Sequence, residues 1–265
     1  MPEGDTIFQT AAALRPLLVG RVVLAARAKT PGPAIERIVG STVTSVEPVG
    51  KHMLIRFDNG LALHTHLRMA GTWHRYAPGE RWKMPAWQAR VVLAVPEHVV
   101  VCFNAPVAEL MDARAIELHP ALQALGPDLL APEFPGDVAL QRLKARPELE
   151  VAEALLDQRA MAGVGNVFKS EVLFLEAVHP WTRVAALDDA TLERLIATAR
   201  RLLLDNIRPG HPHRVTTRGD PSARASLWVY GRTHQPCTRC GTHIQTRRQG
   251  TLNRPTYWCP HCQPA

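Results

Sequence analysis

CTRCGTHIQTRRQGTLNRPTYWCPHC, residues 237–262, contains four cysteines in two close pairs: Cys237, Cys240, Cys259 and Cys262. Two residues separate the cysteines of each pair, and 18 residues separate the pairs. Because such pairs can direct four thiolates at one tetrahedral ion with Zn–S distances of about 2.3 Å, the spacing predicts a zinc site. Two disulfides are the alternative, and they are rare in a reducing cytoplasm. A closed four-cysteine site leaves no open position for chemistry, so the predicted ion is structural.

The zinc stretch lies within a strongly basic C-terminal segment. Residues 207–265 contain nine arginines, no lysine and one acid, a net charge of +8. The whole chain carries +7, so residues 1–206 carry the difference, −1. A near-neutral body with a cationic end indicates a polyanionic partner, and we expect a nucleic acid. A solvated basic tail is the alternative, but the four cysteines favour an ordered module.

Length and composition exclude several classes of protein. The 265 residues are 46% hydrophobic and 21% charged, which suits two globular domains with real cores. A disordered, collagenous or disulfide-framed chain is excluded. The sequence lacks a run of about 20 apolar residues, which excludes a membrane span. Its start, MPEGD, does not read as a secretory signal, so we expect a cytoplasmic protein.

The hydrophobic pattern changes along the chain and predicts an α+β fold. Helical spacing over residues 5–18 is followed by strand signals, which include a hairpin on Asn59-Gly60 and a second hairpin of residues 90–95 and 99–103. Later segments have helical periodicity: 151–158, 167–177 and 189–207. We therefore predict an N-terminal antiparallel β-sandwich or barrel with an N-terminal helix, then a helical domain, then a zinc-finger hairpin.

Four prolines between Gly126 and Pro147 predict a linker and set the expected domain boundaries. The expected parts are a β-rich catalytic domain at 1–125, a linker at 126–147, a helical DNA-binding domain at 148–210, and a basic segment with the zinc finger at 211–265.

The two residues after Met1 carry the sharpest chemical signal. Removal of Met1 would make Pro2 the N-terminal residue, and an α-amino group has a pKa of about 7.7–8.0 against about 10.4 for lysine. Such a secondary amine can attack an aldehyde-like sugar carbon and form a cationic iminium. Glu3 could protonate the sugar ring oxygen as the base leaves, provided that Glu3 is desolvated. The alternative is that proline and glutamate simply favour a helix N-terminus.

Three separated motifs occur in order along the chain: Met1-Pro2-Glu3-Gly4, Gly163-Val164-Gly165-Asn166, and the segment from Arg254 to Gln263. Together they resemble the formamidopyrimidine-DNA glycosylase and endonuclease VIII family of base-excision repair enzymes. The resemblance spans nearly the whole chain, and the Arg-Pro-x-Tyr-Trp-Cys-Pro zinc segment is more similar to endonuclease VIII. It implies a DNA glycosylase with AP lyase activity.

The resemblance also implies roles for individual residues. It implies that Pro2 is the nucleophile, that Glu3 is the proton donor, and that Lys51, on a strand, contacts a phosphate near the lesion and assists catalysis. Asn166, in a helix–two-turn–helix element, and Arg254, at the tip of the zinc hairpin, would grip phosphates together. Without the family, Lys51 and Arg254 are ordinary surface charges and Asn166 is a helix-capping residue.

An apolar wedge is expected as well, because an enzyme that acts on a base takes it out of the stack and something fills the gap. Leu67, Arg68 and Met69 lie where a strand ends before Ala70-Gly71. The resemblance implies that this loop inserts into the duplex, and we assign it to DNA binding with Met69 first. The alternative, from strand alternation, is that Leu67 and Met69 belong to the core.

The sequence departs from many relatives at two places. Thr6 stands where many relatives have a second glutamate, so the role of that acid is absent or moved. The stretch Asn104 to Ala108 lacks the Arg and Phe that the formamidopyrimidine branch inserts opposite the lesion. We therefore favour oxidised pyrimidines as substrates over 8-oxoguanine or formamidopyrimidine.

The sequence as a whole predicts a bifunctional glycosylase and lyase that performs β,δ-elimination on damaged DNA. We expect a monomer with one structural zinc ion, no other cofactor, and a bacterial-type, nucleoid-associated location. One alternative is a non-catalytic damage-binding protein on the same scaffold. Another is a zinc-ribbon transcription or RNA factor, which leaves Pro2 and Glu3 unexplained.

Overall fold

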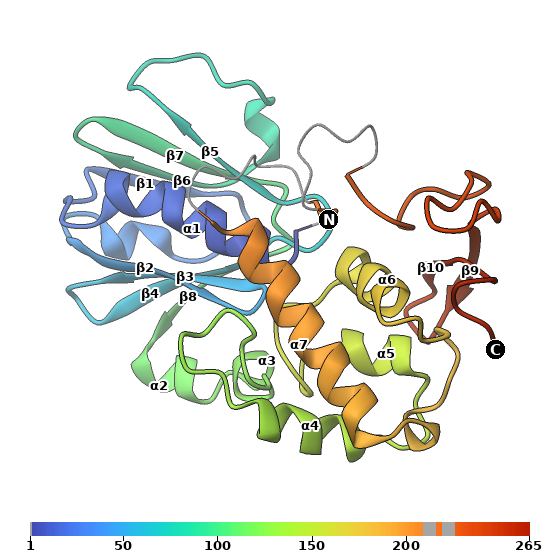
Figure 1. Ribbon diagram of the computed structural model, residues 1–265. Helices are drawn as coiled ribbons and strands as arrows, with labels where there is room; N and C mark the ends of the chain where they lie inside the picture. Colours follow the sequence, from blue (N-terminus) through green and yellow to red (C-terminus); the bar gives the residue numbers. More distant parts are fainter. Residues whose placement is uncertain (1, 209–215, 219–225) are drawn as a thin grey trace. The chain divides into compact units, whose positions relative to one another are not determined.

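A computed structural model describes residues 2–208, 216–218 and 226–265 (Figure 1). The chain divides into two compact units, Met1–Gln123 and Ala124–Ala265. Met1, Arg214, Asp220, Arg224 and the domain boundary expected at 210–211 lie outside the described residues. None of the helices in the described ranges has the length and apolar character needed to cross a bilayer.

The first unit combines one long helix with short strands and short helical turns. In chain order they are α1 (Gly4–Leu18), β1 (Ala25–Ala28), η1 (Ile35–Ile38), β2 (Val43–Val49), β3 (His52–Phe57), β4 (Leu61–His66), β5 (Thr72–Tyr76), η2 (Ala86–Gln88), β6 (Ala89–Val95), β7 (His98–Phe103), β8 (Val107–Asp112), α2 (Ala113–Glu117) and α3 (Pro120–Gln123).

The strands of this unit form two antiparallel four-stranded sheets, in the orders β1-β6-β7-β5 and β2-β3-β4-β8. Both sheets contribute side chains to one hydrophobic core, for example Ile55 and Leu63 from the second sheet and Leu93 and Val100 from the first. Two sheets that share a core in this way form a sandwich. The predicted α+β fold with an N-terminal β-sandwich is confirmed, and both predicted hairpins are present.

Helix α1 packs against β2 and β3 and closes the same core. Its buried side chains Ile7, Ala11, Leu14 and Leu18 recur every three or four residues, which puts them on one face of the helix. Glu3 precedes the helix in an extended conformation, with φ −117° and ψ −172°. The predicted helix over residues 5–18 therefore starts one residue earlier, at Gly4.

The second unit is helical and ends in a two-stranded hairpin (Figure 1). Its elements are α4 (Gly136–Lys144), α5 (Val151–Leu156), α6 (Asn166–Leu175), η3 (Val184–Ala186), α7 (Asp189–Asn206), β9 (Gln245–Gln249) and β10 (Arg254–Trp258). The three helices predicted after residue 150 are present, with ends that differ by one or two residues.

Residues 126–147, expected to be a linker, differ from that expectation. They contain helix α4, and Leu129, Ala139 and Leu143 are buried in the core of the second unit. The reason is positional, because Pro135 lies immediately before the helix and Pro147 lies beyond its last residue. Proline at a helix boundary costs no internal hydrogen bond, so a proline-rich stretch can enclose a packed helix.

A buried carboxylate ties helix α6 to the segment that leads into the zinc finger. Glu171 is fully buried, and its two oxygens accept hydrogen bonds from the backbone N–H groups of Trp228, Val229 and Tyr230 at 2.7–2.9 Å. The hydroxyl of Thr217 donates to the same carboxylate. Donation from several N–H groups compensates the cost of burying a carboxylate.

Candidate active site

Pro2 and Glu3 lie at the start of helix α1, in the first unit. Pro2 is half-buried, whereas the side chain of Glu3 is 0% exposed. The carbonyl of Glu3 accepts the first helical hydrogen bond, from Ile7 N at 3.1 Å. Burial disfavours a charged carboxylate, and this is the desolvation that a proton donor requires.

Asp5 is a second buried carboxyl group in this region, and sequence reasoning missed it because residue 5 was read only as the start of the predicted helix. The helix begins before Asp5, and the side chain is buried. Desolvation raises the pKa of Asp5 to about 6, and hydrogen bonds from the Thr6 backbone and from the Thr6 hydroxyl, 3.3 Å from Asp5 Oδ1, limit the rise. The carboxyl group of Asp5 therefore titrates much closer to neutral pH than that of an exposed aspartate does.

Lys51 lies in the two-residue turn between β2 and β3, not on a strand as expected. The register closes with the pair Val49–His52, and Gly50 supplies a positive φ of 56° for the turn. Lys51 itself is half-buried. A tight turn fixes the backbone from which the lysine side chain extends.

A buried row of polar side chains begins next to Lys51. His52 Nδ1 lies 2.8 Å from His64 Nε2, and His64 Nδ1 lies 2.8 Å from Glu109 Oε2. Burial, with smaller contributions from the nearby His66, His64, His119 and Lys51, lowers the pKa of His52 to about 3. Burial also lowers the pKa of His64, and that of His66 to about 4. These histidines are therefore neutral at pH 7.

His64, Glu109 and His119 are close enough together to hold a metal ion. The hydrogen bonds favour another assignment, because His119 Nδ1 accepts from Leu122 N at 3.3 Å. Because Nδ1 accepts this bond, it is Nε2 of His119 that carries a proton, which points at Glu109 Oε2, 3.2 Å away. A ring nitrogen that carries a proton cannot bind a metal. The observed contacts therefore suit a hydrogen-bonded row of histidines that ends at a carboxylate.

The predicted wedge residues occupy the loop between β4 and β5 and have different environments. Met69 is 58% exposed at the loop, and Arg68 adopts a positive φ of 46°. Leu67 is only 3% exposed and belongs to the core, because the alternation of β4 continues one residue further. The structure therefore removes Leu67 from the wedge and leaves Met69 as its apolar candidate. Gly71 keeps the loop tight, since a Cβ there would lie 2.7 Å from Leu67 Cα.

In the second unit, the structure links Asn166 to the residue after Arg254. Asn166 is the first residue of α6, and its Nδ2 donates to the carbonyl oxygen of Pro255 at 2.8 Å. Arg254 is half-buried, opens strand β10 and pairs with Gln249 across the hairpin. The two predicted phosphate-binding residues therefore belong to elements that are directly hydrogen-bonded.

The four cysteines converge as the sequence predicts. All four sulfur atoms lie within 4.8 Å of one another, with Cys237–Cys262 at 3.9 Å and Cys240–Cys259 at 3.5 Å. A tetrahedron with Zn–S bonds of about 2.3 Å has S–S edges of about 3.8 Å. The residues therefore fit a structural zinc ion.

Some arginines of the basic segment serve packing. The guanidinium of Arg239 lies 4.5 Å from the ring centre of Phe174 and 5.3 Å from that of Trp228, and Arg247 lies 5.0 Å from that of Trp181. Such stacking attaches the zinc module to the helical part of its unit.

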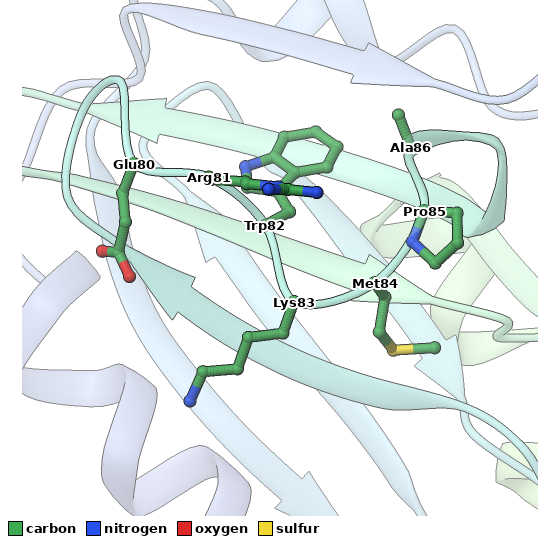
Figure 2. Close-up of a pocket in the computed structure, with 7 residues that line it drawn as sticks. All are labelled: Glu80, Arg81, Trp82, Lys83, Met84, Pro85 and Ala86. Atoms are coloured by element: carbon green, nitrogen blue, oxygen red, sulfur yellow. The ribbon is translucent and has the colours of Figure 1, made fainter.

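A surface recess of about 650 Å³ lies in the first unit, in the long connection between β5 and β6. Figure 2 shows that its lining comes from one stretch of chain, residues 80–86, with Trp82 among them. Trp82 packs edge-on against Phe103, with 5.8 Å between the two ring centres. Pro2, Glu3 and Lys51 do not line this recess, so the loop's own conformation accounts for it.

Three family descriptions match successive parts of the chain: the formamidopyrimidine-DNA glycosylase N-terminal domain at residues 1–115, its H2TH domain at 125–216, and the zinc finger found in FPG and IleRS at 235–265. The chain belongs to the formamidopyrimidine-DNA glycosylase family. This membership confirms the resemblance found in the sequence.

Relatives in this family include proteins named as endonucleases and lyases. A probable endonuclease 8 2 of Streptomyces coelicolor is 44% identical over 99% of this chain and 94% of that protein. A DNA-(apurinic or apyrimidinic site) lyase of Mycolicibacterium smegmatis is 40% identical over the full length of both. Endonuclease 8 of Escherichia coli K12 is 30% identical over 99% of this chain and all of its own.

Solved structures share the fold at low identity. Lactococcus lactis formamidopyrimidine-DNA glycosylase, bound to DNA with an abasic site, has a TM-score of 0.82 at 22% identity over 100% of this chain and 99% of that one. MutM in complex with DNA containing carbocyclic 8-oxo-G has a TM-score of 0.84 at 21% identity over the whole of both chains. The family and the relatives together identify the chain as a DNA-repair glycosylase with AP lyase activity.

Zinc removal provides a test of the cysteine site. We expect one zinc ion per chain, and a strong chelator should expose the backbone amides of residues 237–262 because a two-strand hairpin is marginal alone. Hydrogen–deuterium exchange by mass spectrometry would measure this, with β3 and β4 of the first unit as the internal control. Full protection of the hairpin in metal-free protein would contradict the assignment.

The neutral histidines predict a pH dependence of stability. An unfolded His52 takes up a proton as the pH falls through about 6.5, whereas the folded one does so near 3, so its stabilising contribution is full above 6.5 and is lost below it. We expect that loss to reach about 1.4 kcal/mol per pH unit between pH 6 and 4.

His52→Asn keeps a donor toward His64 and removes this titration. Urea unfolding followed by tryptophan fluorescence at several pH values should therefore show a flatter acid limb for the variant than for the unaltered protein. Identical acid limbs would mean that His52 is already charged in the fold.

Proposed function

We propose that this protein removes oxidised pyrimidine bases from DNA and then cleaves the strand by β,δ-elimination, with the ring nitrogen of Pro2 as its nucleophile. The observation that carries the proposal is the complete burial of Glu3 directly after Pro2, at the start of α1. Glutamate at a helix start normally remains in solvent, where it supports the helix dipole as an anion. Burial favours the proton-carrying form that departure of a base requires.

In the proposed reaction, Met1 is removed and the Pro2 nitrogen attacks C1′ of the damaged nucleotide. The C1′–base bond breaks, and the base leaves with the bonding electrons and takes up the proton that the Pro2 nitrogen releases as it bonds to C1′. Glu3 gives its own proton to the sugar ring oxygen. The ring opens as an iminium forms between Pro2 and C1′. This cationic group accepts electrons during successive loss of the 3′ and 5′ phosphates. Lys51, held by its tight turn, would contact a phosphate near the lesion.

DNA binding is assigned mainly to the second unit. Asn166 and Arg254 would grip backbone phosphates, because the start of α6 and the arginine both suit an anion. Met69, with Arg68 beside it, would fill the gap left by the flipped nucleotide. The proposal thus keeps the catalytic domain at 1–125 and gives DNA binding to residues 148–210 and the zinc finger.

Oxidised pyrimidines are preferred to 8-oxoguanine or formamidopyrimidine as substrates for two reasons. The segment between β7 and β8 reads Asn104-Ala105-Pro106, and it lacks the Arg and Phe that are expected in enzymes of the formamidopyrimidine branch. The most similar proteins described above carry endonuclease 8 or lyase names. We further propose that the enzyme acts on chromosomal DNA as a monomer and uses no small-molecule cofactor in its chemistry.

Covalent trapping tests the nucleophile. With DNA that contains an abasic site, borohydride should reduce the iminium and leave a DNA–protein adduct at residue 2, which peptide mass spectrometry would locate. An alanine at position 2 replaces the secondary amine by a primary one, so trapping should fall at least tenfold. A protein that only recognises damage would yield no adduct, and an adduct at a lysine would contradict the role of Pro2.

Glu3→Gln separates the two chemical steps. The variant lacks the proton for base departure, so excision of an oxidised pyrimidine should fall by about 10²–10⁴-fold. Cleavage at a preformed abasic site should persist in part, because the base has already gone. Gel assays with both substrates would measure the two rates, and equal losses would contradict the role given to Glu3.

A further inference from the structure

Lys169 is a lysine in an unusual place, inside the second unit. It lies in helix α6 and is only 1% exposed. Lys169 follows Asn166 by three positions, which puts the two side chains on the same face of the helix. A lysine rarely leaves water completely unless its ammonium group makes specific hydrogen bonds.

The ammonium group of Lys169 connects the helix to the zinc hairpin. Its Nζ donates to Asn166 Oδ1 at 2.8 Å and to Thr256 Oγ1 at 2.7 Å. Thr256 lies on β10, is fully buried, and donates its own hydroxyl proton to Gln249 Oε1 at 2.8 Å. Gln249 Nε2 donates in turn to Glu150 Oε2 at 2.6 Å. The row of hydrogen bonds thus crosses the hairpin and returns to the start of helix α5.

Lys169 determines which way the Asn166 amide points. An ammonium group only donates, so the atom that faces it must be the oxygen of the amide. The Nδ2 group is then directed at the hairpin, where one hydrogen binds Pro255 O. A charged donor on the oxygen also polarises the amide, which makes its remaining N–H a stronger donor to an anion.

Lys169 also bears on the position of Arg254. Arg254 and Thr256 are two residues apart on β10, so their side chains extend from the same face of the strand. Thr256 accepts a hydrogen bond from Lys169 of α6, so the face of β10 that carries Thr256 is turned toward α6. Arg254 extends from that same face. The same ammonium group thereby orders both residues assigned to phosphate binding.

We propose that Lys169 is a positioning residue for DNA binding, which orients Asn166 and the Arg254 strand so that both address one backbone phosphate. This inference rests on the proposed function, in which those two residues bind phosphate. An apolar side chain of similar length could fill the same space, so packing alone does not call for an ammonium group here.

Lys169→Met tests the proposal, since methionine keeps the length and removes the hydrogen bonds to Asn166 Oδ1 and Thr256 Oγ1. The affinity for duplex DNA with a stable abasic-site analogue should fall about tenfold, as measured by fluorescence anisotropy at several salt concentrations. Lys144→Met is the matched control, because Lys144 is an exposed lysine of the same unit, paired with Asp189 at 2.7 Å. The control should bind within twofold of the unaltered protein.

A double-mutant cycle separates positioning from a general loss of structure. If Lys169 acts through Asn166, Lys169→Met should weaken binding less than twofold once Asn166 has been replaced by alanine. A general weakening of the fold would instead weaken binding equally in both backgrounds, and that result would overturn the proposal. Thr256→Val removes the hydroxyl that accepts from Lys169, and we expect it to weaken binding about threefold even if Lys169→Met does not fold.

The same measurements distinguish this inference from the proposed function. If Asn166→Ala binds DNA as well as the unaltered protein, the phosphate role of Asn166 is wrong and the inference falls with it. If Asn166→Ala weakens binding while Lys169→Met and Thr256→Val do not, the inference alone is overturned.

Discussion

A polar group that leaves water must find a hydrogen-bond partner inside the protein, and this constraint organises the second unit around helix α6. Glu171 of that helix accepts from three successive backbone N–H groups of the segment before the zinc finger, and Lys169 donates to the hairpin itself. The side chains of Glu171 and Lys169 thus extend from one helix and hydrogen-bond to two different segments of chain. The zinc module is therefore attached by directional hydrogen bonds as well as by apolar contact.

The first unit applies the same constraint to titratable groups. Glu3 and Asp5 are carboxyl groups removed from water at the start of α1, and the histidines next to Lys51 are kept neutral by burial. Such groups occur where a protein must hold protons in defined places, which is why perturbed acids and bases cluster at catalytic sites. The arrangement fits a chemistry in which one group must give up a proton while a neighbouring amine stays unprotonated.

Local patterns in the sequence predicted much of this molecule, and long-range contacts account for what they missed. The Asn59-Gly60 hairpin, helix α7 and the cysteine pairs each carry their signal within a short stretch. Helix α4 was hidden because its flanking prolines read as a linker. Thr256, which binds Lys169, lies more than 80 residues away in the sequence, so spacing alone could not reveal this contact. For Leu67, the alternation of side chains along the strand had already given a position in the core as the alternative to the wedge.

The dependence of Arg254 on a two-stranded hairpin has a consequence at the level of the cell. β9 and β10 have five residues each, too little to hold a fixed shape without the neighbouring four-sulfur cluster. If Arg254 binds a backbone phosphate as proposed, a cell short of zinc would keep the chemical groups of the first unit but lose part of the DNA contact that brings them to a lesion. The rate of DNA repair would then depend on the supply of zinc.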